Sequence, residues 1–310
     1  MYAIEVRDLT KTYRGGVEAV RDVSFDVAPG EVFGLLGPNG AGKSTTIGML
    51  TTTVVPTRGS ARLAGFDVAT DPLAARGLSS VVFQEPVVDR SLTGGTNLEL
   101  HARLWGVAPA QARRRTDELA GALGLERLVD RPVSTYSGGE RRRLEIARAL
   151  ISQPRVLFLD EPTVGLDPRI RHELLDVIAG LRARQDLTIL LTTHYLDEAQ
   201  RLCDRVAIMH AGEIVALDTP AALLAGLGGE ILELRAEDDP EHALARLREH
   251  RVAGADAFAI GARLTIPLHE RPAADAIRSL DALGLRASGL AVRTPTLDDV
   301  YLRLTGDALA

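Results

Sequence analysis

A glycine-rich segment that ends in a lysine and two hydroxyl residues carries the most specific chemistry in the sequence. It follows an apolar run, residues 32–36, and opens a stretch, residues 44–50, that is compatible with a helix. A strand, a glycine-rich loop and a helix in this order form the setting in which G-x-x-x-x-G-K-[ST] binds phosphate. The glycines let backbone N–H groups converge on an anion, and the helix N-terminus adds partial positive charge. The loop consists of Gly37, Pro38, Asn39, Gly40, Ala41, Gly42, Lys43, Ser44 and Thr45.

Two side chains of this loop add chemistry to the backbone. Lys43 supplies a full positive charge for the β- and γ-phosphates, and the Ser44 hydroxyl is placed to ligate Mg²⁺. An ordinary glycine turn beside a chance Lys-Ser pair is the simpler alternative, but every fixed position of the pattern is filled and both flanks are correct. The sequence therefore predicts binding of a nucleoside triphosphate.

An acidic pair, Asp160 and Glu161, follows the apolar run of residues 156–159. Two carboxylates at the carboxyl end of a strand, in a chain with a phosphate loop, indicate Mg²⁺ binding and activation of water. Surface acids at the end of a strand are the alternative interpretation. The four apolar residues before the pair favour a functional role for the two acids.

Polar residues also follow two other predicted strands. Gln84 comes where the apolar strand 79–83 gives way to a loop, and His194 follows the β-prone segment 188–192. A histidine in this position is often only a hydrogen-bonded part of the scaffold. On its own, His194 therefore leaves both interpretations open.

A serine and two glycines precede the predicted helix of residues 141–150. Ser137 and Glu140 have the spacing of a capping box. The box does not explain Gly138 and Gly139, because glycine disfavours a helix start. Two glycines do suit a helix N-terminus that brings its backbone close to an anion.

Tyr13 is the only aromatic residue in a turn at residues 11–16. A lone loop tyrosine usually packs or lies on the surface, and stacking on adenine is the alternative.

The elements around these residues divide the chain. Short strands and helices alternate up to about residue 220, with a helical stretch that begins at residue 93. Beyond it, residues 226–229 read as a flexible glycine linker, and residues 228–310 alternate strands and helices without recognisable chemistry. We expect this last segment to be a small α+β domain that supports dimer contacts or regulation and binds no nucleotide.

The composition restricts the class of protein. The 310 residues predict about two domains, and 36 basic against 42 acidic residues give a net charge of −6, which argues against a nucleic-acid surface. Cys203 is the only cysteine, so a reducing compartment is favoured. No signal peptide and no apolar run of ~18 residues is evident. We expect a cytoplasmic protein whose membrane role, if any, comes through a partner.

The order of these motifs identifies a family. The phosphate loop, Gln84, residues 137–140, the acidic pair, residues 165–167 and His194 follow one another on one domain. The combination resembles the ATP-binding subunit of ABC transporters over residues 1–220. The segments 83–86 and 295–301 are similar to a narrower group, the daunorubicin/doxorubicin-resistance exporter ATPases.

The resemblance implies a role for each matching residue beside the nucleotide. Tyr13 looks like the aromatic residue that stacks on adenine, and Gln84 like the glutamine that links Mg²⁺ to the membrane subunit. Asp160 matches the acid that coordinates Mg²⁺, and Glu161 the base that polarises the attacking water. His194 matches the switch histidine against the γ-phosphate.

The resemblance also implies contributions across a dimer. Ser137, Gly138 and Gly139 match the signature that contacts the γ-phosphate held by the opposite subunit, and Asp167 matches the acid of the loop that crosses between subunits. Tyr136 departs from the family's usual leucine.

Glu140 departs from the usual glutamine, but its side chain can reach back and cap its own helix. Neither departure removes a phosphate-contacting group, so we expect an active signature.

The resemblance implies a P-loop NTPase fold of the α/β class, with an inserted helical subdomain near residues 93–150 and an α+β domain at 228–310. It implies an ATPase that uses ATP and Mg²⁺, forms a head-to-tail dimer with a second copy of itself and works at the cytoplasmic face of the membrane. The implied partner is a separate integral-membrane permease of an exporter for drugs or hydrophobic compounds. A soluble ABC ATPase acting on ribosomes or DNA is the alternative, and a nucleotide-binding module without catalysis is a third interpretation.

Overall fold

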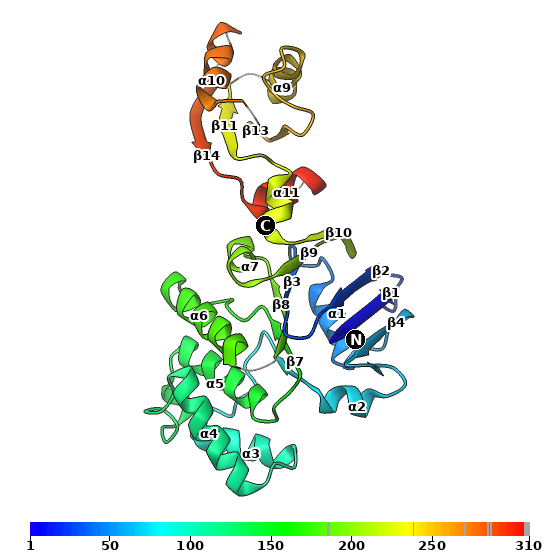
Figure 1. The fold of residues 1–310 in the computed structure, drawn as a ribbon, viewed down its shortest axis with the longest axis vertical. Coiled ribbons are helices and arrows are strands. Elements are labelled where there is room, and N and C mark those ends of the chain that lie inside the picture. Colours follow the sequence, from blue (N-terminus) through cyan, green and yellow to red (C-terminus); the bar gives the residue numbers. More distant parts are fainter. Residues whose placement is uncertain (185–186, 238, 270, 284, 286, 307–310) are drawn as a thin grey trace. The chain divides into compact units, whose positions relative to one another are not determined.

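The chain forms two compact units. The computed structural model describes residues 1–184, 187–237, 239–269, 271–283, 285 and 287–306. The first unit comprises residues 1–194 and 202–214, and the second comprises residues 195–201 and 215–310. Figure 1 shows their elements.

The first unit is built on a largely parallel sheet with the strand order β10-β9-β3-β8-β7-β6. Its central strands β3, β7 and β8 are buried at every residue, which explains their continuous apolar sequences. Parallel pairing places Asp160 of β7 opposite Thr192 of β8. The strands are β3 (Val32–Leu36), β6 (Ser79–Val82), β7 (Val156–Asp160), β8 (Thr188–Thr193), β9 (Arg205–His210) and β10 (Glu213–Asp218).

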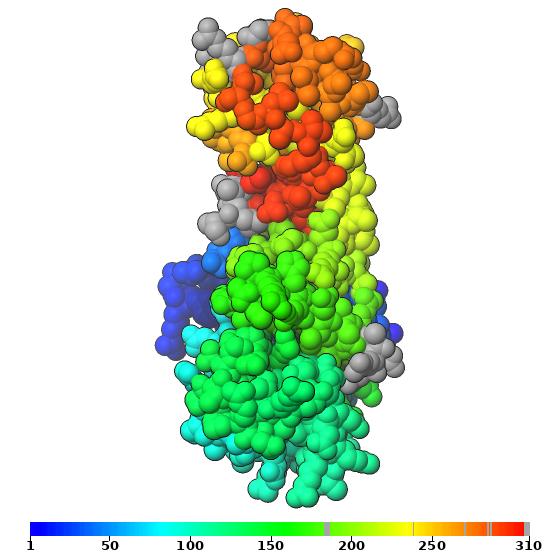
Figure 2. Space-filling model, turned by 90° about the vertical axis from the view of Figure 1, so that its left-hand side faces the viewer, coloured from blue at the N-terminus to red at the C-terminus, as the bar shows by residue number. Residues whose placement is uncertain are grey.

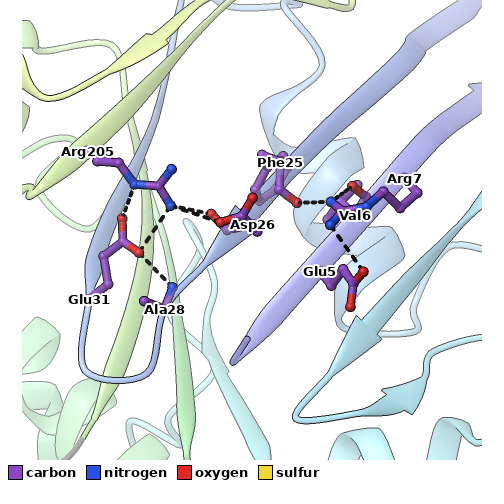
Figure 3. A network of polar contacts seen from close by, with 8 residues as sticks. All are labelled: Glu5, Val6, Arg7, Phe25, Asp26, Ala28, Glu31 and Arg205. Carbon is purple, nitrogen blue, oxygen red and sulfur yellow. Dashed lines mark hydrogen bonds and ion pairs between the residues drawn. The ribbon is translucent and has the colours of Figure 1, made fainter. Parts of the chain in front are cut away.

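An antiparallel sheet, in the order β2-β1-β4-β5, forms a second layer of this unit. Arg205 of β9 joins the layers, because its guanidinium donates to Glu31 at 2.7 Å and to the carbonyl of Asp26 at 2.6 Å (Figure 3). The hydrogen bond to Glu31 raises the pKa of Arg205 above its ordinary value. The strands are β1 (Ile4–Thr12), β2 (Glu18–Val27), β4 (Arg58–Leu63) and β5 (Phe66–Asp67).

Helices fill the space around both sheets. Helix α1 contacts β2 and β4 of one sheet and β7 of the other. The stretch from residue 93 is helical as expected, but it breaks at Gly106, whose φ of 68° ends α3, and Pro109 starts α4. Figure 2 shows residues 93–150, in cyan to green, covering one end of the first unit. The helices of this unit are α1 (Lys43–Leu50), α2 (Pro72–Gly77), α3 (Gly94–Leu104), α4 (Pro109–Leu123), α5 (Gly138–Leu150) and α6 (Pro168–Arg184), with a 3₁₀ turn at Val133–Thr135. Helix α7 (Leu196–Leu202) belongs, except for its last residue, to the second unit.

The second unit contains a four-stranded antiparallel sheet in the order β12-β13-β11-β14. Leucines of β11 and β13 and of helix α9 form its core, together with Ala276 and Leu280 of α10. A turn at Gly261, where φ is 54°, separates the strand at 258–260 from the strand at 263–268. The elements are α8 (Pro220–Ala225), β11 (Glu230–Ala236), α9 (Pro240–Glu249), β12 (Phe258–Ile260), β13 (Arg263–Leu268), α10 (Ala273–Ala282), β14 (Ala287–Arg293) and α11 (Leu297–Thr305).

The segment 226–229 differs from the flexible linker predicted. Leu227 is fully buried, and the carbonyl of Gly226 accepts a hydrogen bond from Arg303 of α11 at 2.8 Å. These contacts make the segment part of the second unit. No helix within the described residues is long and apolar enough to cross a membrane.

Candidate active site

The phosphate loop has the geometry that its glycines predicted. Gly42 has a φ of 103°, and a Cβ atom there would lie 2.4 Å from the carbonyl oxygen of Ala19. At Gly37, a Cβ would lie 2.3 Å from the carbonyl oxygen of Met209. Only glycine fits both positions, because backbone that cannot give way approaches each Cα. Helix α1 begins directly after Gly42, so the free N–H groups of its first turn adjoin the loop.

Lys43 lies inside this loop with only 4% of its surface exposed. Its Nζ donates to the carbonyl oxygens of Gly37 at 2.8 Å and Pro38 at 3.0 Å. Nζ also lies 3.1 Å from Oε1 of Glu161. The loop therefore closes around the ammonium group, and the charge of Lys43 is directed toward the end of β7.

Asp160, Thr192 and Ser44 form a hydrogen-bonded group where β7 and β8 end. The Thr192 hydroxyl donates to Oδ1 of Asp160 at 2.6 Å, and the Ser44 hydroxyl donates to the same oxygen at 3.2 Å. The backbone N–H of Glu161 donates to the Thr192 hydroxyl oxygen at 2.9 Å. Thr192 thus orients both acidic residues.

The hydroxyl and carboxylate oxygens of Ser44 and Asp160 fit a magnesium ion. Mg²⁺ takes one or two protein carboxylates or hydroxyls and completes its shell with water and phosphate oxygens. No cluster of three or more His, Cys, Asp or Glu side chains suited to a metal occurs in the described part of the chain. A nucleotide-borne Mg²⁺ needs no such cluster.

Glu161 adopts a backbone conformation that non-glycine residues seldom take. Its φ is 45°, and its side chain is 6% exposed. One carboxylate oxygen faces Lys43, and the other lies 3.3 Å from Nδ1 of His194. Strained backbone of this kind concentrates at functional sites. Glu161 is therefore held between a lysine and a histidine.

One cavity joins the parts of the site. It has a volume of about 250 Å³, and Gln84 contributes to its wall although it is distant from the loop in sequence. Gln84 also lines a second cavity of about 170 Å³, which Gly138 and Leu166 border. The larger cavity is lined by Ala19, Asn39, Gly40, Gly42, Lys43, Ser44, Thr45, Gln84 and Glu161.

The segment 137–140 caps α5 as the sequence predicted. The Ser137 hydroxyl accepts from the N–H of Glu140 at 3.3 Å, and a Glu140 carboxylate oxygen accepts from the N–H of Ser137 at 2.7 Å. The backbone hydrogen bond from Ser137 lowers the pKa of Glu140. Close packing also requires glycine at position 139, because a Cβ there would lie 2.4 Å from the side chain of Ile170 of α6.

Several predicted site residues do not line the 250 Å³ cavity. Ser137, Gly138 and Gly139 are absent from its wall. Tyr13 lies on the surface, 42% exposed, with the ammonium of Lys11 5.1 Å from its ring centroid. Asp167 accepts a hydrogen bond from the N–H of Ile170 at 3.0 Å, so in this chain it caps the start of α6.

Sequence reasoning did not identify Thr192 or Arg142. Thr192 is the last residue but one of β8, and its importance follows only from the β7–β8 register. Arg142 is 6% exposed and lies on α5 within a run of three arginines, where the simplest expectation is a solvated helix face.

Comparison with known proteins identifies the family. The profile of the ABC transporter family matches residues 20–164. A daunorubicin/doxorubicin resistance ATP-binding protein of Streptomyces peucetius is 42% identical over 310 residues, which cover 98% of this chain and 92% of that protein. The chain belongs to the family of ABC transporter ATP-binding proteins. It is therefore an ATPase, and ATP is its nucleotide.

Other members of the family support the same assignment. A Nod factor export ATP-binding protein of Paraburkholderia xenovorans is 40% identical, in an alignment that covers 98% of this chain and 97% of that protein. The solved dimeric cassette MJ0796, bound to ADP and Pi after hydrolysis, aligns with a TM-score of 0.63 at 26% identity, covering 70% of this chain and 98% of that one. The subunit cbiO1 of Clostridium perfringens, part of the ABC transporter complex cbiONQ, aligns with a TM-score of 0.68 at 26% identity, covering 80% of this chain and 95% of that one. The predicted P-loop NTPase fold is thus confirmed.

Proposed function

We propose that this ATPase powers the export of a drug-like or other hydrophobic compound through a separate membrane permease. The observation that carries the proposal is similarity over nearly the whole chain to ATP-binding proteins named for daunorubicin/doxorubicin resistance and Nod factor export. A protein named for linearmycin resistance in Bacillus subtilis, 32% identical over 99% of both chains, belongs to the same group. The substrate would bind the permease rather than this subunit.

Each site residue would have a separate role in hydrolysis. Water attacks the γ-phosphorus, the bond to the β–γ bridging oxygen breaks, and Glu161 accepts the proton of the attacking water. Lys43 and the loop N–H groups neutralise charge on the β- and γ-phosphates. His194, beside Glu161, would contact the γ-phosphate and keep the carboxylate directed at the water.

Magnesium bound with the nucleotide would neutralise the developing charge on the phosphates. Ser44 and Asp160 would hold it, and Gln84 in the cavity wall would sense it. Tyr13 would stack on adenine from the surface turn.

A head-to-tail dimer would complete each site. Ser137, Gly138 and Gly139 do not line the cavity of their own chain, so a second copy would bring them to the γ-phosphate. Asp167, at the start of α6, would lie where the two copies meet. The dimeric form of MJ0796 shows that cassettes of this fold associate in pairs.

An apolar surface beside Gln84 suits the permease. A cavity of about 290 Å³ is bordered by Phe83, Val87 and Trp105, which are 37%, 53% and 38% exposed. Large exposed apolar side chains grouped at a cavity mark sites of protein contact. Docking there would place the chain at the cytoplasmic face of the membrane, next to the loop that senses the nucleotide.

A soluble ABC ATPase acting on ribosomes or DNA was the alternative. The similarity to transport and resistance subunits favours the exporter. The experiment is a search of the neighbouring reading frames for a hydrophobic protein of several spans, then co-expression of the two proteins and purification from detergent-solubilised membranes. ATP-dependent uptake of daunorubicin into inverted vesicles, abolished by Glu161→Gln, would support the proposal. Failure of the two proteins to co-purify would contradict it.

A further inference from the structure

A buried arginine on α5 gathers backbone carbonyls from two loops of the site. Arg142 donates from Nε to the carbonyl of Pro162 at 2.6 Å and from Nη2 to the carbonyls of Asp160 at 3.2 Å and Glu161 at 3.0 Å. Its Nη1 donates to the carbonyl of Phe83. Burial lowers the pKa of the guanidinium from its ordinary value. A cation so enclosed is normally compensated, and here the backbone carbonyls and the charges of Glu145 and Asp160 do so.

Three residues along the same helix, Glu145 holds the other end of the Gln84 loop. The carboxylate of Glu145, 1% exposed, accepts the backbone N–H groups of Val87 and Val88, each at 2.7 Å. Phe83 and Val87 flank the loop of residues 84–86. Helix α5, which begins at the signature, is thus hydrogen-bonded to the backbone on both sides of this loop.

Arg142 also fixes one side of the strained Glu161 peptide. Glu161 has its φ of 45° between two anchors, Thr192 at its N–H and Arg142 at its carbonyl. A residue keeps such a conformation only where its surroundings enforce it. Without Arg142, the backbone of Glu161 gains freedom to relax and its carboxylate to move from the attacking water.

We propose that Arg142 is a positioning residue that ties the signature helix to the catalytic Glu161 and to the Gln84 loop. Movement of α5, when its N-terminus meets the γ-phosphate of the other subunit, then reaches the base and the Gln84 loop of its own subunit through one side chain. This inference rests on the proposed role of Glu161.

The test compares Arg142→Met, which keeps an unbranched apolar stem and loses all donors, with Arg142→Lys and a control, Arg115→Met. Arg115 of α4 also donates to a backbone carbonyl, that of Ile151 at 2.7 Å, but it borders neither nucleotide cavity. We expect Arg142→Met to lower kcat about 10–100-fold with ADP affinity within about twofold of wild type. Arg142→Lys should recover part of kcat, and Arg115→Met should keep it.

A double mutant separates positioning from general damage. In the Glu161→Gln background, Arg142→Met should reduce the residual turnover by less than about threefold, because residues that act as a unit are not additive. A reduction equal to that in wild type would overturn the inference. A wild-type kcat in the single variant Arg142→Met, together with a lowered kcat in Glu161→Gln, would also overturn it.

Full turnover in Glu161→Gln would instead overturn the role of Glu161 and this inference with it. If Arg142→Met does not fold, Arg142→Lys and Glu145→Gln carry the test. Wild-type kcat in both would then reject the inference.

Discussion

At the scale of single residues, the site depends on a buried ion pair. Lys43 and Glu161 are 4% and 6% exposed and face each other at 3.1 Å. Each supplies the charge that compensates the burial of the other, and removing one partner leaves an uncompensated charge. ATP phosphates would approach the same ammonium group, so we expect the contacts of Lys43 to determine affinity and those of Glu161 to determine rate.

Lys43→Ala is expected to weaken ATP binding on the order of 10–100-fold, because charged hydrogen bonds to phosphate contribute about 1.5–3 kcal/mol. Calorimetry with Mg·ATP measures the change. Lys43→Arg, which keeps the charge, is the comparison variant, and thermal unfolding checks that both proteins fold. Unchanged affinity in Lys43→Ala would remove the lysine from phosphate binding.

The residues that could be predicted from the sequence carry their information locally. The phosphate loop, the acidic pair and the capping box are each read from a few adjacent positions. Thr192 and Arg142 could not be found in this way, because their partners are 31 or more and 18 or more positions away along the chain. Their contacts follow from strand register and helix docking.

At the scale of elements, helices α3 and α5 meet at a histidine. His101 accepts a hydrogen bond from the indole N–H of Trp105 at 2.9 Å, and Nδ1 lies 3.5 Å from Nη1 of Arg148. Burial, together with the charge of Arg148, lowers the pKa of His101 to about 4. Protonation would break the contact with Trp105, which borders the proposed permease surface.

The fluorescence of Trp105, the only tryptophan, should report this pKa. We expect no His101 transition between pH 7.5 and 5.5 in wild type, because the imidazole is neutral throughout. Arg148→Met should raise the pKa and bring a transition toward that range. As pH falls from 6.5 to 4, the unfolded chain binds a proton that the folded one does not, so stability falls. A wild-type fluorescence midpoint near 6.5 would contradict this arrangement.

The strands and most helices followed from apolar periodicity, whereas their interruptions did not. The turns at Gly106 and Gly261 depend on positive φ values at single glycines, and such values are not evident among the many glycines of the sequence. The burial of Leu227 could not be predicted either, since a glycine-rich linker and a packed turn look alike in sequence.

In the second unit, Arg293 joins β14 to α11. It donates to both carboxylate oxygens of Asp299 at 2.7 Å and to Glu233 at 2.9 Å. Burial alone would raise the pKa of Asp299, but the hydrogen bonds from Arg293 leave it below its ordinary value. Asp299 is 1% exposed, so its charge depends on this partner.

Arg293→Met should destabilise the second unit by about 3–5 kcal/mol, because it leaves a buried carboxylate unpaired. ATP binding by the first unit should be unchanged. If the second unit supports dimer contacts, ATPase activity should fall most at low protein concentration. Calorimetric unfolding and activity at several concentrations measure both effects. Arg278→Met, on an exposed pair with Asp275, is the control. A concentration-independent activity would reject the dimer role.

At the scale of the whole molecule, the proposed dimer would give each chain half of two sites. Lys43, Gln84 and Glu161 line the cavity of the phosphate loop, whereas Gly138 of the same chain borders the second cavity. Two copies in head-to-tail contact would close two sites at once, and hydrolysis would release them. An ATP-driven cycle of closure and opening would then move the permease.

The most direct measurement of this account is the mass of Glu161→Gln by light scattering during size-exclusion chromatography. The variant should bind Mg·ATP and slow turnover on the order of 10²–10⁴-fold, so the closed state accumulates. The account predicts the mass of two chains with Mg·ATP and of one with Mg·ADP, and Gly138→Asp added to it should prevent dimerisation. A single-chain mass with ATP bound would contradict the account.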